Sequence, residues 1–200
     1  MKNNPLKIAG NITADELNEL PLKTFEGKVI LIQEQEKLSS LFDEINDHEV
    51  VGFDTETRPS FKKGERHKVS LMQIALPEKV YLIRLHHTGF SPTLFEWLEK
   101  DDRLKAGVGL RDDLQALQKI RHFVPGGFSE LSTLAKTAGF EVESVRKLAG
   151  LLLGFRISKS AQTSNWEAPA LSQKQIEYAA TDAWVCLEIY KKLIAQPKVT

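Results

Sequence analysis

The sequence predicts an α/β protein in which helices flank a mixed central sheet. Short apolar runs with strand character are concentrated in the first half of the chain, and segments with helical character dominate the second half. Strand and helix candidates also alternate, and together these patterns favour an α/β sandwich. With 200 residues, of which 42% are hydrophobic, the chain is long enough to bury one sizeable core.

The expected strands are short and apolar, and turn residues separate them. They cover residues 28–33, 50–56, 69–76, 80–85 and 104–108. The turn Pro77-Glu78-Lys79 joins two of them, so a hairpin is expected there. Residues 1–27 precede the first strand, and we interpret them as a polar N-terminal extension of a domain that covers residues 28–200.

Several helices have recognisable start and stop signals. Ser91 followed by Pro92 is a typical start, because serine caps free N–H groups and proline fits the first turn. Ser172 and Gln175 form a capping-box pattern. Glycines are expected to end two helices, at positions 139 and 154. Besides the helix that begins at Ser91, the expected helices cover residues 14–20, 36–46, 113–121, 129–138, 144–153 and 173–195.

Composition restricts the functional classes. The 27 basic and 27 acidic residues cancel, so any attraction for nucleic acid must be local. The single cysteine, Cys186, excludes a disulfide framework and is expected to be a core residue in a reducing compartment. The sequence shows neither an apolar signal core nor a run of about 18 apolar residues. We therefore expect a cytoplasmic protein, or a nuclear one in a eukaryote, with no membrane partner.

Two acidic residues close an apolar run at Val51-Gly-Phe-Asp-Thr-Glu56. Strand side chains alternate between faces, so Asp54 and Glu56 are expected to point the same way, about 6.6 Å apart along the strand. In the final helix Tyr178 and Asp182 are four residues apart and share a face. Crowded carboxylates repel each other, and hard cations such as Mg²⁺ or Mn²⁺ relieve that repulsion. From these pairs alone, a solvated strand face and a core tyrosine beside a surface acid remain alternatives.

A third acidic element lies at Asp112 and Asp113, where a strand and a glycine-containing turn lead into a helix. Acids near a helix N-terminus often act only as caps, because the helix dipole and free N–H groups stabilise them. Two adjacent acids suit a division of labour in which one caps the helix and the other faces a site.

The order of these residues resembles the DEDDy class of 3′–5′ exonucleases, and within it the exonuclease domain of the Werner syndrome helicase and its stand-alone relatives. The class carries its acid directly before the helix's first apolar residue, which favours Asp113 over Asp112. The sister class has a histidine where this chain has Glu177, so the chain resembles the tyrosine type. The similar segments are Val51-Gly-Phe-Asp-Thr-Glu56, Lys68-Val-Ser-Leu-Met-Gln-Ile-Ala75, Gly107-Val-Gly-Leu-Arg-Asp-Asp113, Lys159-Ser-Ala-Gln-Thr-Ser-Asn-Trp166 and Tyr178-Ala-Ala-Thr-Asp-Ala183.

The resemblance implies a ribonuclease H-like exonuclease fold and a role for each site residue. Asp54 would bridge two divalent cations, Mg²⁺ or Mn²⁺; Glu56 and Asp182 would complete the first metal site, and Asp113 would hold the second. Tyr178 would orient the attacking water. The implied activity removes nucleoside 5′-monophosphates from the free 3′ end of single- or double-stranded nucleic acid. DNA is the favoured substrate, and RNA stays an alternative because related ribonuclease D enzymes share these carboxylates.

Contacts to nucleic acid are expected near these residues. Residues 58–68 form a basic segment, which is also compatible with a plain solvated loop. Basic side chains there suit salt-dependent contacts with phosphates. Trp166 is either a core residue or part of a pocket for the terminal nucleotide. The expected contact residues are Arg58, Lys62, Lys63, Arg66, Lys68, Lys159 and Trp166.

Two other functions fit part of the pattern. One is a catalytically silent nucleic-acid-binding domain on the same scaffold, which the presence of all four carboxylates and the tyrosine disfavours. The other is a carboxylate–metal endonuclease of the PIN type, which would cut a closed circle, whereas an exonuclease needs an end. The sequence does not indicate protein partners.

Overall fold

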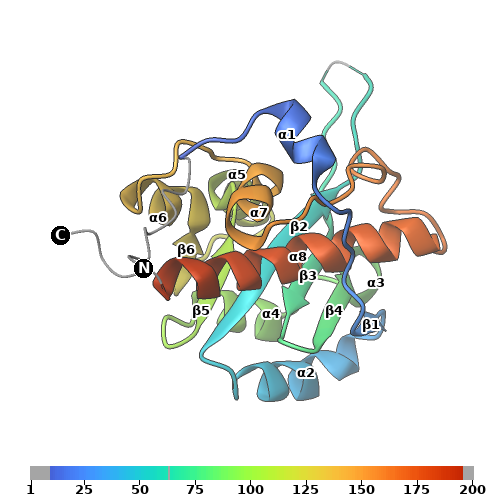
Figure 1. The fold of residues 1–200 in the computed structure, drawn as a ribbon. Coiled ribbons are helices and arrows are strands. Elements are labelled where there is room, and N and C mark those ends of the chain that lie inside the picture. Colours follow the sequence, from blue (N-terminus) through green and yellow to red (C-terminus); the bar gives the residue numbers. More distant parts are fainter. Residues whose placement is uncertain (1–9, 63, 196–200) are drawn as a thin grey trace, which may run out of the picture.

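A computed structural model describes residues 10–62 and 64–195 of the protein. Its centre is a six-stranded mixed sheet with the strand order β1-β4-β3-β2-β5-β6 (Figure 1). β3 pairs antiparallel with β2 and β4, and the remaining pairs are parallel. The predicted α/β class is therefore confirmed. The strands are β1 (Lys28–Ile32), β2 (Val50–Thr57), β3 (Val69–Ala75), β4 (Lys79–Arg84), β5 (Leu104–Gly107) and β6 (Phe128–Glu130).

Helices cover both faces of the sheet. Figure 1 shows α8 running across one face, and the apolar side chains of α2 and α4 pack on the other. The helical elements are α1 (Ala14–Glu19), η1 (Gln35–Lys37), α2 (Leu38–Ile45), α3 (Leu85–Thr88), α4 (Pro92–Glu99), α5 (Leu110–Gln118), α6 (Leu131–Thr137), α7 (Val145–Leu153) and α8 (Gln173–Ile194). In the part of the chain described, no helix has the length and apolar character needed to cross a membrane.

The close approach of α8 to β2 depends on small residues. Ala179, Ala180 and Ala183 of α8 are buried against the sheet. Opposite them Gly52 has no side chain, and a Cβ atom there would overlap the carbonyl oxygen of Ala183. Because Gly52 and Asp54 are two residues apart on one strand, they share the face that α8 covers. This packing brings the middle of α8 next to the acidic end of β2.

The segment before β1 packs on the domain. Ile12 and Leu17 are buried, and a Cβ atom at Gly150 of α7 would meet the ends of both side chains. Further along, the backbone N–H of Lys23 donates to the carbonyl of Arg156 at 3.0 Å. Residues 10–27 thus lie along α7 and α8 (Figure 1).

Most of the predicted helices and strands are present, and the turn and capping residues in the sequence predicted several of their boundaries correctly. The hairpin of β3 and β4 is confirmed by their antiparallel pairing. Ser91 accepts a hydrogen bond from the N–H of Leu94 and caps α4. The capping box of Ser172 and Gln175 is confirmed at the start of α8.

Four boundaries or elements differ from the prediction. Residues 128–130 form the edge strand β6, so the helix expected from residue 129 begins only at Leu131. The helix expected at 113–121 is α5, which begins three residues earlier at Leu110, because Gly109 in the left-handed conformation (φ 76°) supplies its start. The single helix expected at 36–46 is divided into η1 and α2, and α3 was not predicted.

Candidate active site

Three carboxylates that are distant in sequence converge between β2 and α8. One oxygen from each of Asp54, Glu56 and Asp182 lies within 4.8 Å of the other two. Glu56 is 9% exposed and Asp182 is 7% exposed, and the Oδ1 atom of Asp182 has no hydrogen-bond partner. An unpaired buried carboxylate oxygen is costly. The group therefore has the composition and the unmet coordination that suit a hard cation.

The end of β2 extends beyond the neighbouring strand β5. β5 pairs with β2 only from Val50 to Gly52, so the strand positions of Asp54 and Glu56 lie beyond this pairing. The turn after β5 and the start of α5 lie at the end of that pairing. A Cβ atom at Gly107 would come 2.8 Å from the carbonyl oxygen of Phe53, so glycine lets this turn approach β2 closely.

Burial raises the pKa values of the converging acids. It raises the pKa of Glu56 to about 9 and that of Asp182 to about 7. It also holds the pKa of Asp54 well above its usual range, and repulsion from Asp182 and Glu56 adds to the effect. Arg146 on α7 acts in the opposite direction, because its charge lowers the pKa of Asp182. Without a cation, the site therefore retains protons that a metal ion would displace.

Tyr178 lies one helical turn before Asp182 and lines the same site. Burial, followed by the charge of Asp182, raises the pKa of the Tyr178 phenol far above its usual value. Its ring packs against Trp166, with the ring centroids 6.0 Å apart. Trp166 has 0% exposure, so the expectation of a nucleic-acid contact at Trp166 is wrong. The indole instead supports the tyrosine ring from within the core.

Asp113 lies beside this group rather than within it. It is placed by the first turn of α5, and its carboxylate accepts a hydrogen bond from the hydroxyl of Thr55 on β2. Burial raises the pKa of Asp113 to about 6, and the hydrogen bond from Thr55 partly offsets that rise. The charge of Asp113 in turn raises the pKa values of Asp54 and Glu56. The structure thus places all four predicted acids close enough to interact.

A carboxylate from β6 caps the helix that carries Asp113. Glu130 accepts hydrogen bonds from the N–H groups of Gly109 (3.1 Å) and Leu110 (2.9 Å), at the start of α5. The same side chain accepts bonds from the N–H and hydroxyl of Ser132, at the start of α6. The expectation that one of the two adjacent acids caps the helix is therefore wrong, and Asp112 is exposed.

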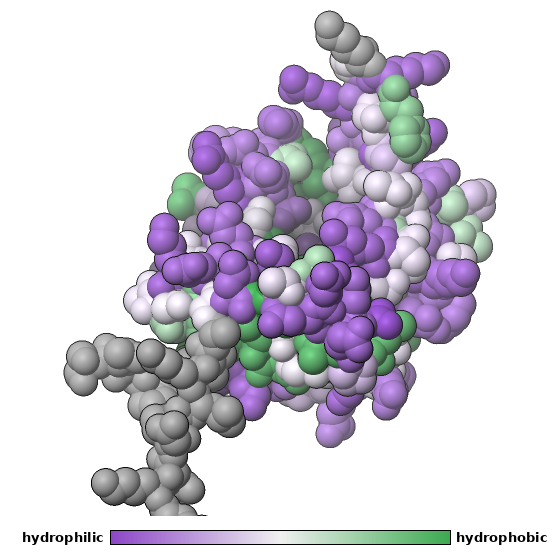
Figure 2. Space-filling view, turned by 45° about the horizontal axis from the view of Figure 1, so that its top comes forward, coloured by the Kyte–Doolittle hydropathy of each residue, from purple (hydrophilic) through white to green (hydrophobic). Residues whose placement is uncertain are grey.

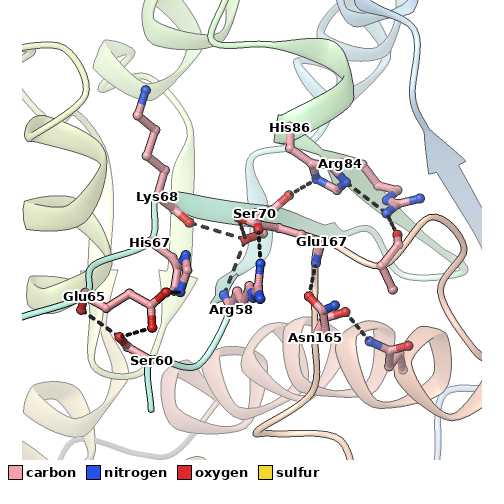
Figure 3. A network of polar contacts seen from close by, with 12 residues as sticks. Arg58, Ser60, Glu65, His67, Lys68, Ser70, Arg84, His86, Asn165 and Glu167 are labelled. Atoms are coloured by element: carbon pink, nitrogen blue, oxygen red, sulfur yellow. Dashed lines mark hydrogen bonds and ion pairs between the residues drawn. The ribbon is translucent and has the colours of Figure 1, made fainter. Parts of the chain in front are cut away.

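A polar network ties the loop before α8 to the sheet (Figure 3). The guanidinium of the buried Arg84 donates to the carbonyl oxygens of Ala168 and Pro169. One oxygen of Glu167 accepts from the Ser70 hydroxyl at 3.4 Å, and the other accepts from Arg58 at 3.3 Å. This network links the loop that contains Trp166 to the base of the basic segment.

The described parts of the basic segment, residues 58–62 and 64–68, form an arm between β2 and β3 that projects from the body (Figure 1). Figure 2 looks toward the end of the molecule from which it projects, and that face is mostly hydrophilic. Arg58 is partly held by Glu167, whereas Lys159 lies apart from the arm in the loop before α8. Lys63 lies outside the described residues. The predicted contact residues with exposed side chains are Arg58, Lys62, Arg66, Lys68 and Lys159.

Comparison with known proteins agrees with this site. The 3′–5′ exonuclease family profile matches residues 29–197. The chain belongs to the 3′–5′ exonuclease family. It is 34% identical, over 88% of its length, to the mouse bifunctional 3′-5′ exonuclease/ATP-dependent helicase WRN, and it spans only 13% of that protein.

Solved structures place this exonuclease domain in the ribonuclease H-like fold that the resemblance implies. The EXO domain of Nibbler from Aedes aegypti has a TM-score of 0.78 at 25% identity, covering 86% of this chain and 90% of that one. Escherichia coli RNase D, an exoribonuclease, has a TM-score of 0.76 at 23% identity, covering 84% of this chain and 44% of that one. The latter likeness supports the fold alone.

Three residues that shape the exonuclease site could not be identified as site residues from the sequence. Thr55 lies between the two acids of β2 in the sequence. Strand alternation predicts that its side chain points to the opposite face, but not that it contacts Asp113. Glu130 and Arg146 come from elements that are distant in sequence from the acids they influence. No local pattern distinguishes them from other surface charges, and only the tertiary packing brings them to the site.

Proposed function

We propose that the chain is a divalent-metal-dependent 3′–5′ exonuclease that releases nucleoside 5′-monophosphates, with DNA preferred to RNA. The observation that carries the proposal is the convergence of Asp54, Glu56 and Asp182, with one oxygen of each within 4.8 Å of the others. Family membership supports the reaction class. The 32% identity with DNA polymerase I of Aquifex aeolicus, over 70% of this chain, supports the preference for DNA, and the fold shared with an exoribonuclease makes RNA the substrate to test against it.

The donor set fits two divalent cations. Asp54, Glu56 and Asp182 would hold one Mg²⁺ or Mn²⁺ ion, and Asp113 together with Asp54 would hold a second. All donors are carboxylate oxygens, which hard cations prefer. When bound, such ions lower the pKa of coordinated water and stabilise the negative charge that develops at the phosphate.

Tyr178 orients the attacking water in this proposal. Because burial and the charge of Asp182 raise the pKa of its phenol, the hydroxyl keeps its proton at neutral pH and is a poor general base. A neutral phenol can still donate one hydrogen bond and accept another. The packing of its ring on Trp166 limits the positions that the hydroxyl can occupy.

Basic side chains supply the proposed contacts with the phosphate backbone. The arm offers Arg58, Lys62, Arg66 and Lys68, and the loop before α8 offers Lys159. Contacts of this kind give affinity that depends on salt and not on base sequence. We also propose that residues 28–200 are the catalytic domain, and that residues 1–27 are an extension whose described part packs on α7 and α8.

A digestion experiment with matched substrates tests the proposed function. DNA and RNA strands of one sequence, labelled at the 3′ end, are incubated single- and double-stranded with Mg²⁺ or Mn²⁺. We expect labelled mononucleotides, faster from DNA, and none with a chelator; we also expect Ca²⁺ to inhibit. Asp54→Ala should abolish turnover, whereas the exposed Asp43→Ala serves as a matched control.

Three results would contradict the proposal. Cleavage of a closed circular strand would indicate an endonuclease, since an exonuclease requires an end. Binding of single strands without turnover in any metal would indicate a silent nucleic-acid-binding domain. A folded Asp54→Ala variant that keeps its turnover would remove the carboxylate cluster from the mechanism.

A further inference from the structure

Gln73, in the middle of β3, is an unexplained polar residue in the core. Its side chain has 0% exposure, and neither Oε1 nor Nε2 has a hydrogen-bond partner. A buried carboxamide that makes no hydrogen bond destabilises the folded state, because its polar groups lose their hydration without compensation. Native structures contain few such groups, and each one calls for an explanation.

The strand register places Gln73 beside a catalytic carboxylate. Gln73 pairs directly with Asp54 of β2 on one side and with Leu82 of β4 on the other. Directly opposed residues point to the same face of a sheet, with Cβ atoms about 4.5–5.5 Å apart. Gln73 therefore lies on the face covered by α8.

Most of the other neighbours on that face are apolar, although the cluster also contains the rings of Trp166 and Tyr178. Leu71 and Ala75, which flank Gln73 on β3, belong to the same buried cluster as Leu82. The nearby residues of α8 in this cluster include Ala179 and Ala183. The strand partner Asp54 is the carboxylate that pairs directly with Gln73 and can accept a hydrogen bond from its carboxamide, whereas the unpartnered indole N–H of Trp166 can only donate.

We propose that Gln73 is a positioning residue for Asp54. In the metal-bound protein its Nε2 donates a hydrogen bond to one carboxylate oxygen of Asp54 and fixes the carboxylate plane, so that the other oxygen faces the cations. The inference rests on the proposed metal site and adds a residue that lies outside the coordinating group. Hydrogen bonds of this kind orient metal ligands, and losing one typically weakens metal binding about 10–100-fold.

The residue type fits this role better than the alternatives. A carboxamide is neutral, so it adds no charge to a site that already concentrates several acids. It also supplies two donors for an acceptor-only carboxylate. Leucine or methionine would fill a similar volume among Leu71, Ala75 and Leu82 without leaving buried polar atoms, and would therefore stabilise the fold.

The test measures Mn²⁺ affinity and melting temperature in Gln73→Met and Gln73→Leu, and so separates a positioning role from a packing role. Mn²⁺ is titrated into the metal-free chain of 200 residues by calorimetry, and thermal melting is recorded with and without the ion. We expect Mn²⁺ affinity to fall roughly 10-fold or more, while the metal-free melting temperature stays level or rises. The control Met72→Leu changes the next residue, which is equally buried on the opposite face, and should leave Mn²⁺ affinity unchanged.

Kinetic measurements give a second readout. At subsaturating Mn²⁺ both Gln73 variants should turn over slowly, and raising the Mn²⁺ concentration should restore much of the rate, with the KM for nucleic acid unchanged. Wild-type Mn²⁺ affinity in either folded variant would overturn the role of Gln73 and leave the proposed exonuclease function intact. A wild-type chain that binds no Mn²⁺ would overturn both.

Discussion

Gly52 of β2 lies directly beneath the carbonyl group of Ala183 on α8, and no Cβ atom fits between them. The obstacle is backbone, which cannot rotate away as a flexible side chain can. We predict that Gly52→Ala moves α8 and separates Asp182 from the acids of β2. Overpacking of this kind typically costs about 1–3 kcal/mol, and we expect turnover to fall at least 10-fold. Thermal melting and single-turnover rates measure both effects.

Gly150→Ala is the matched control for that substitution. The atoms that a new Cβ would meet there are the ends of the Leu17, Leu20 and Ile12 side chains, which can shift. Alanine also favours a helix over glycine by about 1 kcal/mol. We expect Gly150→Ala to keep its turnover. Equal losses in the two variants would show that the approach of α8 to β2 has no special role.

The neighbouring acids of α5 should differ sharply in importance. Asp113 accepts a hydrogen bond from Thr55, and its charge raises the pKa values of Asp54 and Glu56. Asp112 is exposed. We predict that Asp113→Asn lowers turnover by roughly 10²-fold or more, the scale of a contact that acts in the transition state. Asp112→Asn should change it less than about twofold, because exposed charges contribute little. An exchange of these two phenotypes would reassign the catalytic acid.

Tyr178→Phe isolates the hydroxyl from the ring. Phenylalanine keeps the packing against Trp166 and loses only the hydrogen-bonding group. We predict a fall in turnover of roughly 10²–10³-fold with Mn²⁺ affinity nearly unchanged, because no metal ligand is lost. Calorimetric titration and single-turnover kinetics on one preparation measure both. A lower melting temperature with normal turnover would instead assign Tyr178 a structural role.

The stability of the metal-free protein should fall as pH rises. The folded-state pKa values of Asp113, Asp182 and Glu56 are raised to about 6, 7 and 9, so the folded state holds protons that the unfolded chain has already lost. The stabilising protonation is complete below about pH 4, near the unfolded values. It is lost as the pH rises through the folded-state values.

A pH series of melting curves tests this direction. Between about pH 5 and pH 9 we expect the metal-free melting temperature to decrease, by roughly 2–4 °C for each kcal/mol lost. Mn²⁺ should raise it more at the alkaline end, because the ion then competes with fewer protons. Asp54→Ala, which removes one of the repelling acids, should flatten the profile. A melting temperature that rises with pH in the absence of metal would contradict the assigned pKa directions.

Local signals explain why much of the fold was predictable. The alternation around Asp54, the capping box at Ser172 and the Ser91-Pro92 start each act within a few residues, so each can be recognised in the sequence. Spacing also places Tyr178 and Asp182 on one face of a helix. Their convergence with Asp54 and Glu56 came from the family resemblance, since no local rule relates residues more than a hundred positions apart.

The elements that escaped prediction depend on tertiary contacts. β6 has only three residues and exists because Phe128, Ser129 and Glu130 pair with β5 at the sheet edge. In the sequence, Gln73 looks like any other strand residue. Only the strand register shows that it pairs with Asp54. The loop position of Trp166 fits either a core residue or a pocket residue, and its burial against Tyr178 favours the core.

The two sides of the acidic site differ in how they are supported. Asp54 and Glu56 belong to a strand that pairs with β3 at both positions, and Asp182 belongs to the longest helix described, which packs on that strand. Asp113 instead lies on α5 near the edge of the sheet. There Glu130, from the three-residue strand β6, accepts hydrogen bonds from the start of α5. A substitution that breaks these contacts at the sheet edge can therefore displace Asp113 while the rest of the molecule keeps its structure. Inactive variants of this kind would still fold.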